Sequence, residues 1–381
     1  MAEQHEKALV PQIRFTGFTD PWEQRKLGEL TESYSGGTPA AGESEFYGGS
    51  IPFIRSAEIA AESTELFLTE KGYESSSARM VKPGDVLYAL YGATSGEVAV
   101  SRQKGAINQA ILAILPRDDC DARYITAWLR KQKGYIVTTY LQGGQGNLSG
   151  VIVKNLEVFI PSLPEQQKIG FMLSHLDSLI TLHQRKYDKL CVLKKSMLDK
   201  MFPKGGSLYP EIRFAGFTDP WEQRKLGEVA HFINGRAYSQ NELLSSGKYP
   251  VLRVGNFYTN DSWYYSNLEL EDKNYAYEGD LLYTWSATFG PHIWHGNKVI
   301  YHYHIWKVQL EAALEKLFAF QLLERDKERI LSDKNGSTMV HITKTGIENT
   351  SVLMPCSVEE QRRIGAFFDR LDSLITLHQR K

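Results

Sequence analysis

The stretch IRFTGFTDPWEQRKLGE, Ile13 to Glu29, returns 199 residues later as IRFAGFTDPWEQRKLGE, Ile212 to Glu228. The two copies differ only at Thr16, which is replaced by Ala215. Solenoid repeats are much shorter than this spacing, so the repeat indicates a duplicated domain. The fold is therefore expected to consist of two related units in tandem.

A second repeat closes each unit. LDSLITLHQRK occupies Leu176 to Lys186 and again Leu371 to Lys381. Between these framing repeats the two bodies differ in amino-acid sequence. Both nevertheless consist of short apolar runs bounded by Gly, Pro and Asp, which is typical of strands and turns. The matched body segments are GSIPFIRSAEI (49–59) with GKYPVLRVGNF (247–257), KPGDVLYALYGATSG (82–96) with YEGDLLYTWSATFG (277–290), and INQAILAI (107–114) with YHYHIWKV (301–308).

We expect an α/β (α+β) fold of two similar globular domains separated by an antiparallel coiled coil of two long helices, with a pseudo-twofold axis. PKGGS, 203–207, reads as a linker after the first helix. The predicted segments are an N-terminal extension (1–12), a first domain (13–161), a first long helix (162–202), a linker (203–211), a second domain (212–355) and a second helix (356–381).

A heptad pattern follows the proline that ends each body. Apolar residues recur there at alternating spacings of four and three, which is typical of a coiled-coil seam. Such a seam packs either on its own globular body or on the related helix of the other unit, and the continuity of the heptads favours the second alternative. The seam residues are Ile169, Leu173, Leu176 and Ile180 in the first helix, and Ile364, Phe368, Leu371 and Ile375 in the second.

The composition is that of an ordinary soluble protein. The 381 residues are 42% hydrophobic and 23% charged, and the formal net charge is −1. No run approaches the roughly 20 apolar residues that span a bilayer, and the charged N-terminus lacks a signal core. The three cysteines have no CxxC spacing. We expect a cytoplasmic protein without a membrane partner, and any DNA binding must rely on local charge or on partner subunits.

These motifs together resemble the specificity subunit of type I restriction-modification systems. The resemblance lies in the duplicated WEQRKLGE opening, the GDxLY strand, the EQ[QR][KR]IG helix start and the closing LDSLITLHQRK with KKSMLDKMF. It covers nearly the whole chain, and the order and duplication of the motifs are more specific than any one of them.

The resemblance implies a non-catalytic subunit of an enzyme that methylates adenine. Each domain would read one half of a bipartite double-stranded DNA target, and the helices would set the gap between the halves. The subunit would dock two methyltransferase subunits and restriction subunits. S-adenosylmethionine, ATP and Mg would be bound by those partners, so no cofactor is expected on this chain. The second helix stops at Lys381, where the first continues, so we expect a truncation or a shortened distal coiled coil.

Candidate DNA contacts are polar and aromatic residues on the bodies. Arg reads guanine, Asn and Gln read adenine, and exposed rings pack against bases or sugars. An ion-paired arginine, an ordinary glycine-rich turn and a core aromatic ring are the alternatives at these positions. The candidates are Arg55, Tyr91, Asn108, Gln109, Gln145 and Asn147 in the first body, and Arg253, Trp285, His302, His304 and His341 in the second.

Catalytic motifs are missing from the sequence. It contains no Pro-Pro pair for an amino-methyltransferase loop and no phosphate-binding GxxxxGK[ST]. The histidines near His302 lack the cysteine or HExxH companions of a zinc site, so no metal is expected. A tandem carbohydrate-binding protein is the alternative function, suggested by duplicated, aromatic-rich bodies, although the heptads and the missing export signal argue against it.

Overall fold

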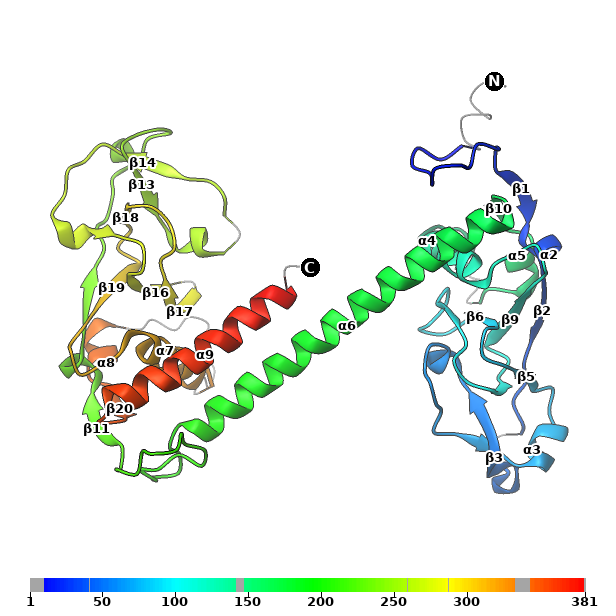
Figure 1. Cartoon of the computed structure of the whole chain (residues 1–381), viewed down its shortest axis with the longest axis horizontal. Coiled ribbons are helices and arrows are strands. Elements are labelled where there is room, and N and C mark those ends of the chain that lie inside the picture. Colours follow the sequence, from blue (N-terminus) through cyan, green and yellow to red (C-terminus); the bar gives the residue numbers. More distant parts are fainter. Residues whose placement is uncertain are drawn as a thin grey trace. The chain divides into compact units, whose positions relative to one another are not determined.

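The computed structural model describes residues 10–40, 42–141, 147–258, 260–286, 288–332 and 343–379. The chain divides into two compact units, Met1–Thr181 (unit 1) and Leu182–Lys381 (unit 2). Figure 1 colours unit 1 from blue to green and unit 2 from green to red. Each unit combines sheets and helices, so the expected mixed α/β fold in two parts is confirmed.

The described residues of unit 1 form two four-stranded sheets and a two-stranded ribbon. The strands are β1 (Glu23–Lys26), β2 (Thr31–Ser35), β3 (Tyr47–Ile54), β4 (Phe67–Leu68), β5 (Arg79–Val81), β6 (Val86–Ala89), β7 (Val98–Val100), β8 (Gly105–Ile107), β9 (Ile111–Pro116) and β10 (Glu157–Ile160). One sheet has the order β2-β9-β6-β7, and the other has the order β4-β3-β8-β5 with β3 parallel to β8. The ribbon pairs β1 with β10.

Unit 2 repeats this topology strand for strand. Its strands are β11 (Glu222–Lys225), β12 (Ala230–Asn234), β13 (Tyr249–Leu252), β14 (Tyr264–Ser266), β15 (Tyr275–Ala276), β16 (Leu281–Ser286), β17 (Thr288–Ile293), β18 (Val299–Tyr301), β19 (Ile305–Leu310) and β20 (Ser351–Met354). The sheet orders are β12-β19-β16-β17 and β14-β13-β18-β15, β13 is parallel to β18, and β11 pairs with β20. Two bodies with different sequences thus have one fold.

The helices follow the same twofold plan. The α-helices are α2 (Leu27–Leu30), α3 (Glu70–Glu74), α4 (Ala122–Leu141), α5 (Gly150–Lys154), α6 (Leu163–Met201), α7 (Lys316–Ser332), α8 (Lys344–Glu348) and α9 (Val358–Gln379). The 3-10 helices are η1 (Ser44–Phe46), η2 (Ser56–Glu58), η3 (Leu226–Glu228), η4 (Gln240–Glu242), η5 (Val254–Phe257) and η6 (Asp272–Asn274). Helix α4 packs on β7 in unit 1, and α7 packs on β17 and α9 in unit 2.

The framing repeat is joined to the long helix by a buried ion pair in each unit. Arg14 donates from Nε and Nη2 to the two carboxylate oxygens of Glu165, both at 2.8 Å. Arg213 binds Glu360 in the same way at 2.7 and 2.8 Å. The two glutamate side chains are 0% and 1% exposed. The first residue of the EQxxIG motif therefore fixes the start of the helix to its own body.

The glutamine of the EQxxIG motif makes a second connection in each unit. The Gln361 amide donates to the carbonyl oxygens of Ala313 and Pro355, and its Oε1 accepts from the backbone N–H of Glu315. Gln166 makes the matching set of three hydrogen bonds in unit 1. Because three chain segments meet at one buried side chain, the body and its helix form a single packed block.

Within unit 2 the end of α6 packs antiparallel to α9. Figure 1 shows the red helix α9 beside the green end of α6. His183 Nδ1 lies 2.9 Å from His378 Nδ1, and Lys194 Nζ lies 2.5 Å from Asp372 Oδ1. The residue numbers rise along one helix as they fall along the other, so the expected antiparallel helix pair is confirmed in this unit.

The seam residues of α9 are buried to different extents. Ile364, Phe368 and Leu371 are buried in the main core of unit 2, where they contact both the body and the α6 residues Met197 and Met201. Both packing alternatives are thus realised in unit 2. Ile375 is half-buried further along α9.

In unit 1 the predicted seam residues differ in exposure, and their role in a coiled coil stays a prediction. Ile169 packs on the core of its body and Leu173 is half-buried, but Leu176 and Ile180 are 46% and 65% exposed. The described part of α9 ends at Gln379, next to the paired His378, so the antiparallel contact runs from His183 toward the C-terminal end of α6.

Candidate nucleic-acid interface

Each unit changes from one sheet to the other at a tight turn. Residues 108–110 connect β8 to β9, and residues 302–304 connect β18 to β19. The chain turns here because β8 and β18 pair with β3 and β13 in one sheet, whereas β9 and β19 pair with β2 and β12 in the other.

Each turn is contacted by a chain segment that follows the framing repeat, at Gly36 in unit 1 and at Gly235 in unit 2. A Cβ atom on Gly36 would lie 1.8 Å from the Ile107 carbonyl oxygen, and one on Gly235 would lie 2.3 Å from the His302 carbonyl oxygen. Only glycine permits this approach. The backbone N–H of the next residue then donates to the strand before the turn in both units. The twin turns are therefore held in one geometry, and their side chains are the variable part.

In unit 1 the turn carries amide side chains. Asn108 is half-buried, and its Oδ1 accepts from the backbone N–H of Ala110 at 3.1 Å. Gln109 is exposed, and its Oε1 accepts from the Thr38 hydroxyl. Because Thr38 fixes the oxygen, the Gln109 amide NH₂ is the donor left to project from this turn.

In unit 2 the turn carries aromatic rings. The ring centroids of His302 and His304 lie 4.9 Å apart, and the Tyr303 ring lies 3.9 Å from that of His304. Trp285 supports the turn from β16, because its Nε1 donates to the Tyr303 carbonyl at 2.9 Å and its ring stacks on Trp306. Trp285 is half-buried, so most of its contacts are structural.

Burial lowers the pKa of both turn histidines. Burial, together with the nearby charges of His304 and Arg253, lowers the pKa of His302 to about 4. Burial also lowers the pKa of His304. A neutral imidazole presents one donor and one acceptor, so this turn offers hydrogen bonds without adding positive charge.

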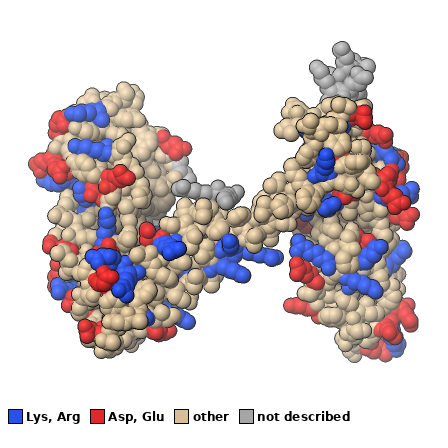
Figure 2. Space-filling model, viewed as in Figure 1, with Lys and Arg blue, Asp and Glu red and all other residues tan. Residues whose placement is uncertain are grey.

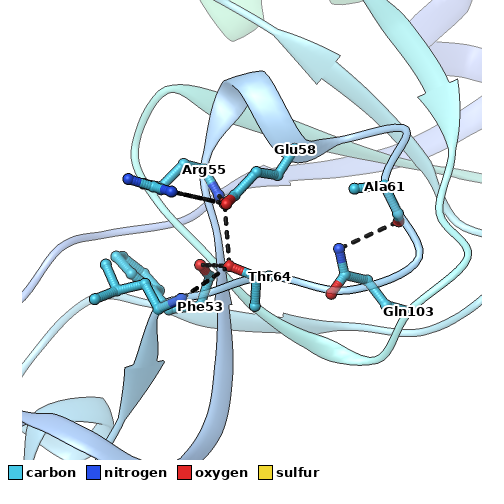
Figure 3. Close-up of polar contacts among 7 residues, drawn as sticks. Phe53, Arg55, Glu58, Ala61, Thr64 and Gln103 are labelled. Atoms are coloured by element: carbon cyan, nitrogen blue, oxygen red, sulfur yellow. Dashed lines mark hydrogen bonds and ion pairs between the residues drawn. The ribbon is translucent and has the colours of Figure 1, made fainter. Parts of the chain in front are cut away.

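Arg55 and Arg253 occupy equivalent places after β3 and β13 but differ in their partners. Figure 3 shows Arg55 donating to Glu58, which also accepts from the Thr64 hydroxyl at 3.1 Å. The hydrogen bonds from Arg55 hold the pKa of Glu58 below its usual range. The same Thr64 hydroxyl lies 3.0 Å from the Phe53 carbonyl oxygen, so its single proton is shared between the two acceptors (Figure 3). Arg55 is therefore ion-paired within its own loop, which was the structural alternative for this residue.

The remaining candidates of unit 1 meet beside the GDxLY strand. Tyr91 is half-buried and forms an isolated antiparallel bridge with Asn147, which is exposed. Burial raises the pKa of Tyr91, so its hydroxyl stays protonated and can donate. Gln145 and His341 lie outside the described residues. Whether any of these residues contacts DNA stays a prediction.

The comparison with known protein families decides the identity of this scaffold. The profile described as "Type I restriction modification DNA specificity domain" matches residues 19–191 and again 218–381. The chain belongs to this family. The resemblance inferred from the motifs is thereby confirmed, and the two matched regions correspond to the two units.

Relatives of this specificity-domain protein carry the same description. The type I restriction enzyme MjaIX specificity subunit of Methanocaldococcus jannaschii is 28% identical over 251 residues, which are 61% of this chain and 57% of that protein. The EcoR124I/EcoR124II specificity subunit of Escherichia coli is 26% identical over 187 residues, 44% of this chain and 46% of that protein. The matches thus span about half the length of these relatives.

A solved structure shares the fold. The S subunit of a type I restriction-modification system from M. genitalium aligns with a TM-score of 0.65 at 15% sequence identity. The alignment covers 97% of this chain and 94% of that chain. At this identity the likeness concerns the fold alone, and it agrees with the duplicated topology of the specificity-domain protein.

The structure adds residues that the sequence did not single out. Arg236 and Tyr238 follow Gly235, and the Arg236 guanidinium lies 5.1 Å from the Tyr238 ring centroid. The Tyr238 ring lies 6.5 Å from that of His302. Tyr303 projects from the turn itself and is 39% exposed. Arg236 and Tyr238 are far from His302 and Tyr303 in the sequence, which hides this grouping. Because the first two follow β12, the other two precede β19, and β12 pairs with β19, the strand pairing could have suggested it.

Charged side chains of both signs are mixed on the surface of the specificity-domain protein (Figure 2). Figure 2 shows Lys and Arg interspersed with Asp and Glu on the face in view, without a field of one sign. In the described part of the chain, no three His, Cys, Asp or Glu residues cluster closely enough to hold a metal ion. Across the same part, no helix is both long and apolar enough to cross a membrane.

Proposed function

We propose that this chain is the non-catalytic DNA-specificity subunit of a type I restriction-modification enzyme. Each unit reads one half of a bipartite duplex target. The observation that carries this proposal is the contrast between an identical scaffold and different turns. The same joints and glycine braces recur in both units, whereas Asn108 and Gln109 in unit 1 stand against His302 and Tyr303 in unit 2.

The long helices serve the partners in this proposal. They set the spacing between the half-sites and dock two methyltransferase subunits, and restriction subunits join the assembly. Exposed apolar residues on both helices of unit 2 support docking. They are Leu182 in α6 (53% exposed) and Leu374 and Leu377 in α9 (38% and 54% exposed). S-adenosylmethionine, ATP and Mg belong to the partners, and the chain works in the cytoplasm with them.

The charge distribution supports a role within an assembly. Nucleic-acid binding gains much of its affinity from phosphate neutralisation by Lys and Arg. With a net charge of −1 and interspersed charges, the isolated chain should bind duplex DNA weakly at physiological salt (Figure 2). The methyltransferase subunits then supply the remaining contacts to the duplex.

A body exchange tests the proposal. Residues 36–156 are replaced by the matching body of another specificity subunit, which keeps β10 paired with β1 and leaves the Arg14–Glu165 joint intact. The chimaera is co-expressed with its methyltransferase, and methylated adenines are mapped across the genome. One half of the target sequence should change while the other half and the gap stay constant.

The matched exchange of residues 235–350 in unit 2 should change the other half only. If either exchange altered both halves, or if the methylated sequence ignored the exchange, the proposal would be wrong. A purified chain that methylates DNA without partners would also contradict the non-catalytic assignment.

A further inference from the structure

The loops after β3 and β13 are built alike, with one difference of charge. In both, an arginine precedes a 3-10 helix, and the side chain three residues later accepts from the arginine backbone N–H. That residue is Glu58 in unit 1 and Asn256 in unit 2. The cap is conserved in geometry, but only the first loop has a carboxylate beside the guanidinium.

The carboxylate neutralises Arg55. Glu58 accepts from Arg55 Nε at 3.2 Å and from Nη2 at 2.7 Å, so its carboxylate occupies the Nε–Nη2 edge of the guanidinium. In unit 2 the Asn256 amide instead donates to the carbonyls of Asn260 and Ser262. Arg253 makes no ion pair with the described residues of the chain, so its positive charge is not neutralised.

Arg253 is nevertheless held in a defined orientation. Its Nη2 donates to the Ser262 carbonyl at 3.1 Å, and its guanidinium lies 4.3 Å from the ring centroid of Tyr264. Tyr264 is 39% exposed, so the stacked pair lies at the surface. Stacking on a ring limits the entropy lost on binding, and because Nε is buried, the Nη groups are the part of the guanidinium that can reach a ligand. The neighbouring His302 is neutral and does not repel this charge.

We infer that Arg253 is a specificity-determining residue of unit 2 that reads guanine, and that Glu58 keeps Arg55 from the same role in unit 1. Guanine presents its O6 and N7 acceptors in the major groove, and the guanidinium edge matches them. This inference rests on the proposed function, because it requires that unit 2 reads a DNA half-site. It assigns at least one G·C pair to that half-site.

The substitution Asn256→Glu tests the inference, because it introduces in unit 2 the residue that unit 1 has at the equivalent position. Glu58 accepts the same capping hydrogen bond in unit 1, so the variant should keep this cap and pair with Arg253, while it loses the two donations to Asn260 and Ser262. The full chain is co-expressed with its methyltransferase, and methylation is quantified at every site that differs from the target by one base. Discrimination at one G·C position in one half-site should fall by about 10-fold or more. The other half-site should be unchanged.

Two further variants control the result. Arg253→Gln should relax the same position, and Glu58→Gln should leave the half-site read by unit 2 unaltered. If Asn256→Glu changes the unfolding midpoint of the protein, the inference is tested by the target sequence of Arg253→Gln alone. Arg253 makes its side-chain contacts at the surface, so this substitution should leave stability unchanged.

Two outcomes would overturn the inference. One is an unchanged target sequence in Asn256→Glu and in Arg253→Gln while methylation continues. The other is a uniform loss of methylation at all sites without a change of sequence, which indicates a phosphate contact. Both outcomes leave the body exchange intact, so failure of this inference is distinguishable from failure of the proposed function.

Discussion

Replacing Gln361 by Met should destabilise unit 2 strongly although it changes little volume. Gln361 is 0% exposed and hydrogen-bonds three backbone groups, the carbonyls of Ala313 and Pro355 and the N–H of Glu315. A buried group that loses its partner costs about 1 kcal/mol or more. The Pro355 contact is fully buried and the other two are partly buried, so we expect a loss of roughly 2 to 4 kcal/mol.

Urea unfolding followed by tryptophan fluorescence measures this loss. Unit 2 holds five of the seven tryptophans, and Trp221 is 1% exposed in the core that Gln361 adjoins. The matched control is Gln223→Met, because Gln223 is exposed in the framing repeat and should change stability by less than about 0.5 kcal/mol. A loss below about 1 kcal/mol for Gln361→Met, with an unchanged m-value, would refute the view that the EQxxIG motif is a structural joint.

The remaining expectations concern helix contact and pH. Gly170→Ala should cost unit 1 about 1 to 3 kcal/mol in urea unfolding, because the new Cβ would lie 2.8 Å from the Tyr124 backbone nitrogen. Gly134→Ala, which meets nothing within 4 Å, should instead be neutral or stabilising by up to about 1 kcal/mol, and equal losses would contradict the packing argument. Burial lowers the pKa of His292 to about 4, so the unfolded state binds the proton first and unit 2 should lose stability as the pH falls from about 6.5 to 4. The loss should reach at most about 3 kcal/mol and should shrink in His292→Gln, and an unchanged pH slope in that variant would show that His292 is not the cause.

The framing repeats have a structural role within each unit. The structure shows that Arg14 and Glu165 in unit 1, like Arg213 and Glu360 in unit 2, join each frame to its own helix. Single-sequence reasoning could not find this joint, because about 150 residues separate the two members of each pair. The duplication itself contained a clue, since both members recur together.

The candidate DNA contacts could be predicted only in part. Sequence comparison of the two bodies placed Asn108 and His302 at matching positions, and the structure puts both in the twin turns. It could not distinguish Arg55 from Arg253, because the distinction depends on Glu58 and Asn256 and on a ring, Tyr264, that is brought close by β-pairing. Side-chain partners across strands are set by register, which pattern alone does not give.

The sequence by itself determined the duplication, the mixed α/β class, the segments around the GDxLY strand and the antiparallel helix pair, because periodicity and internal repetition are local properties of the chain. The tertiary structure alone decided which arginine is neutralised, where the strands break into turns, and how far the helix seam is buried. Those features depend on distances of a few ångström between segments far apart in sequence. The packed sheets and buried joints such as the pair of Arg213 and Glu360 fix such distances.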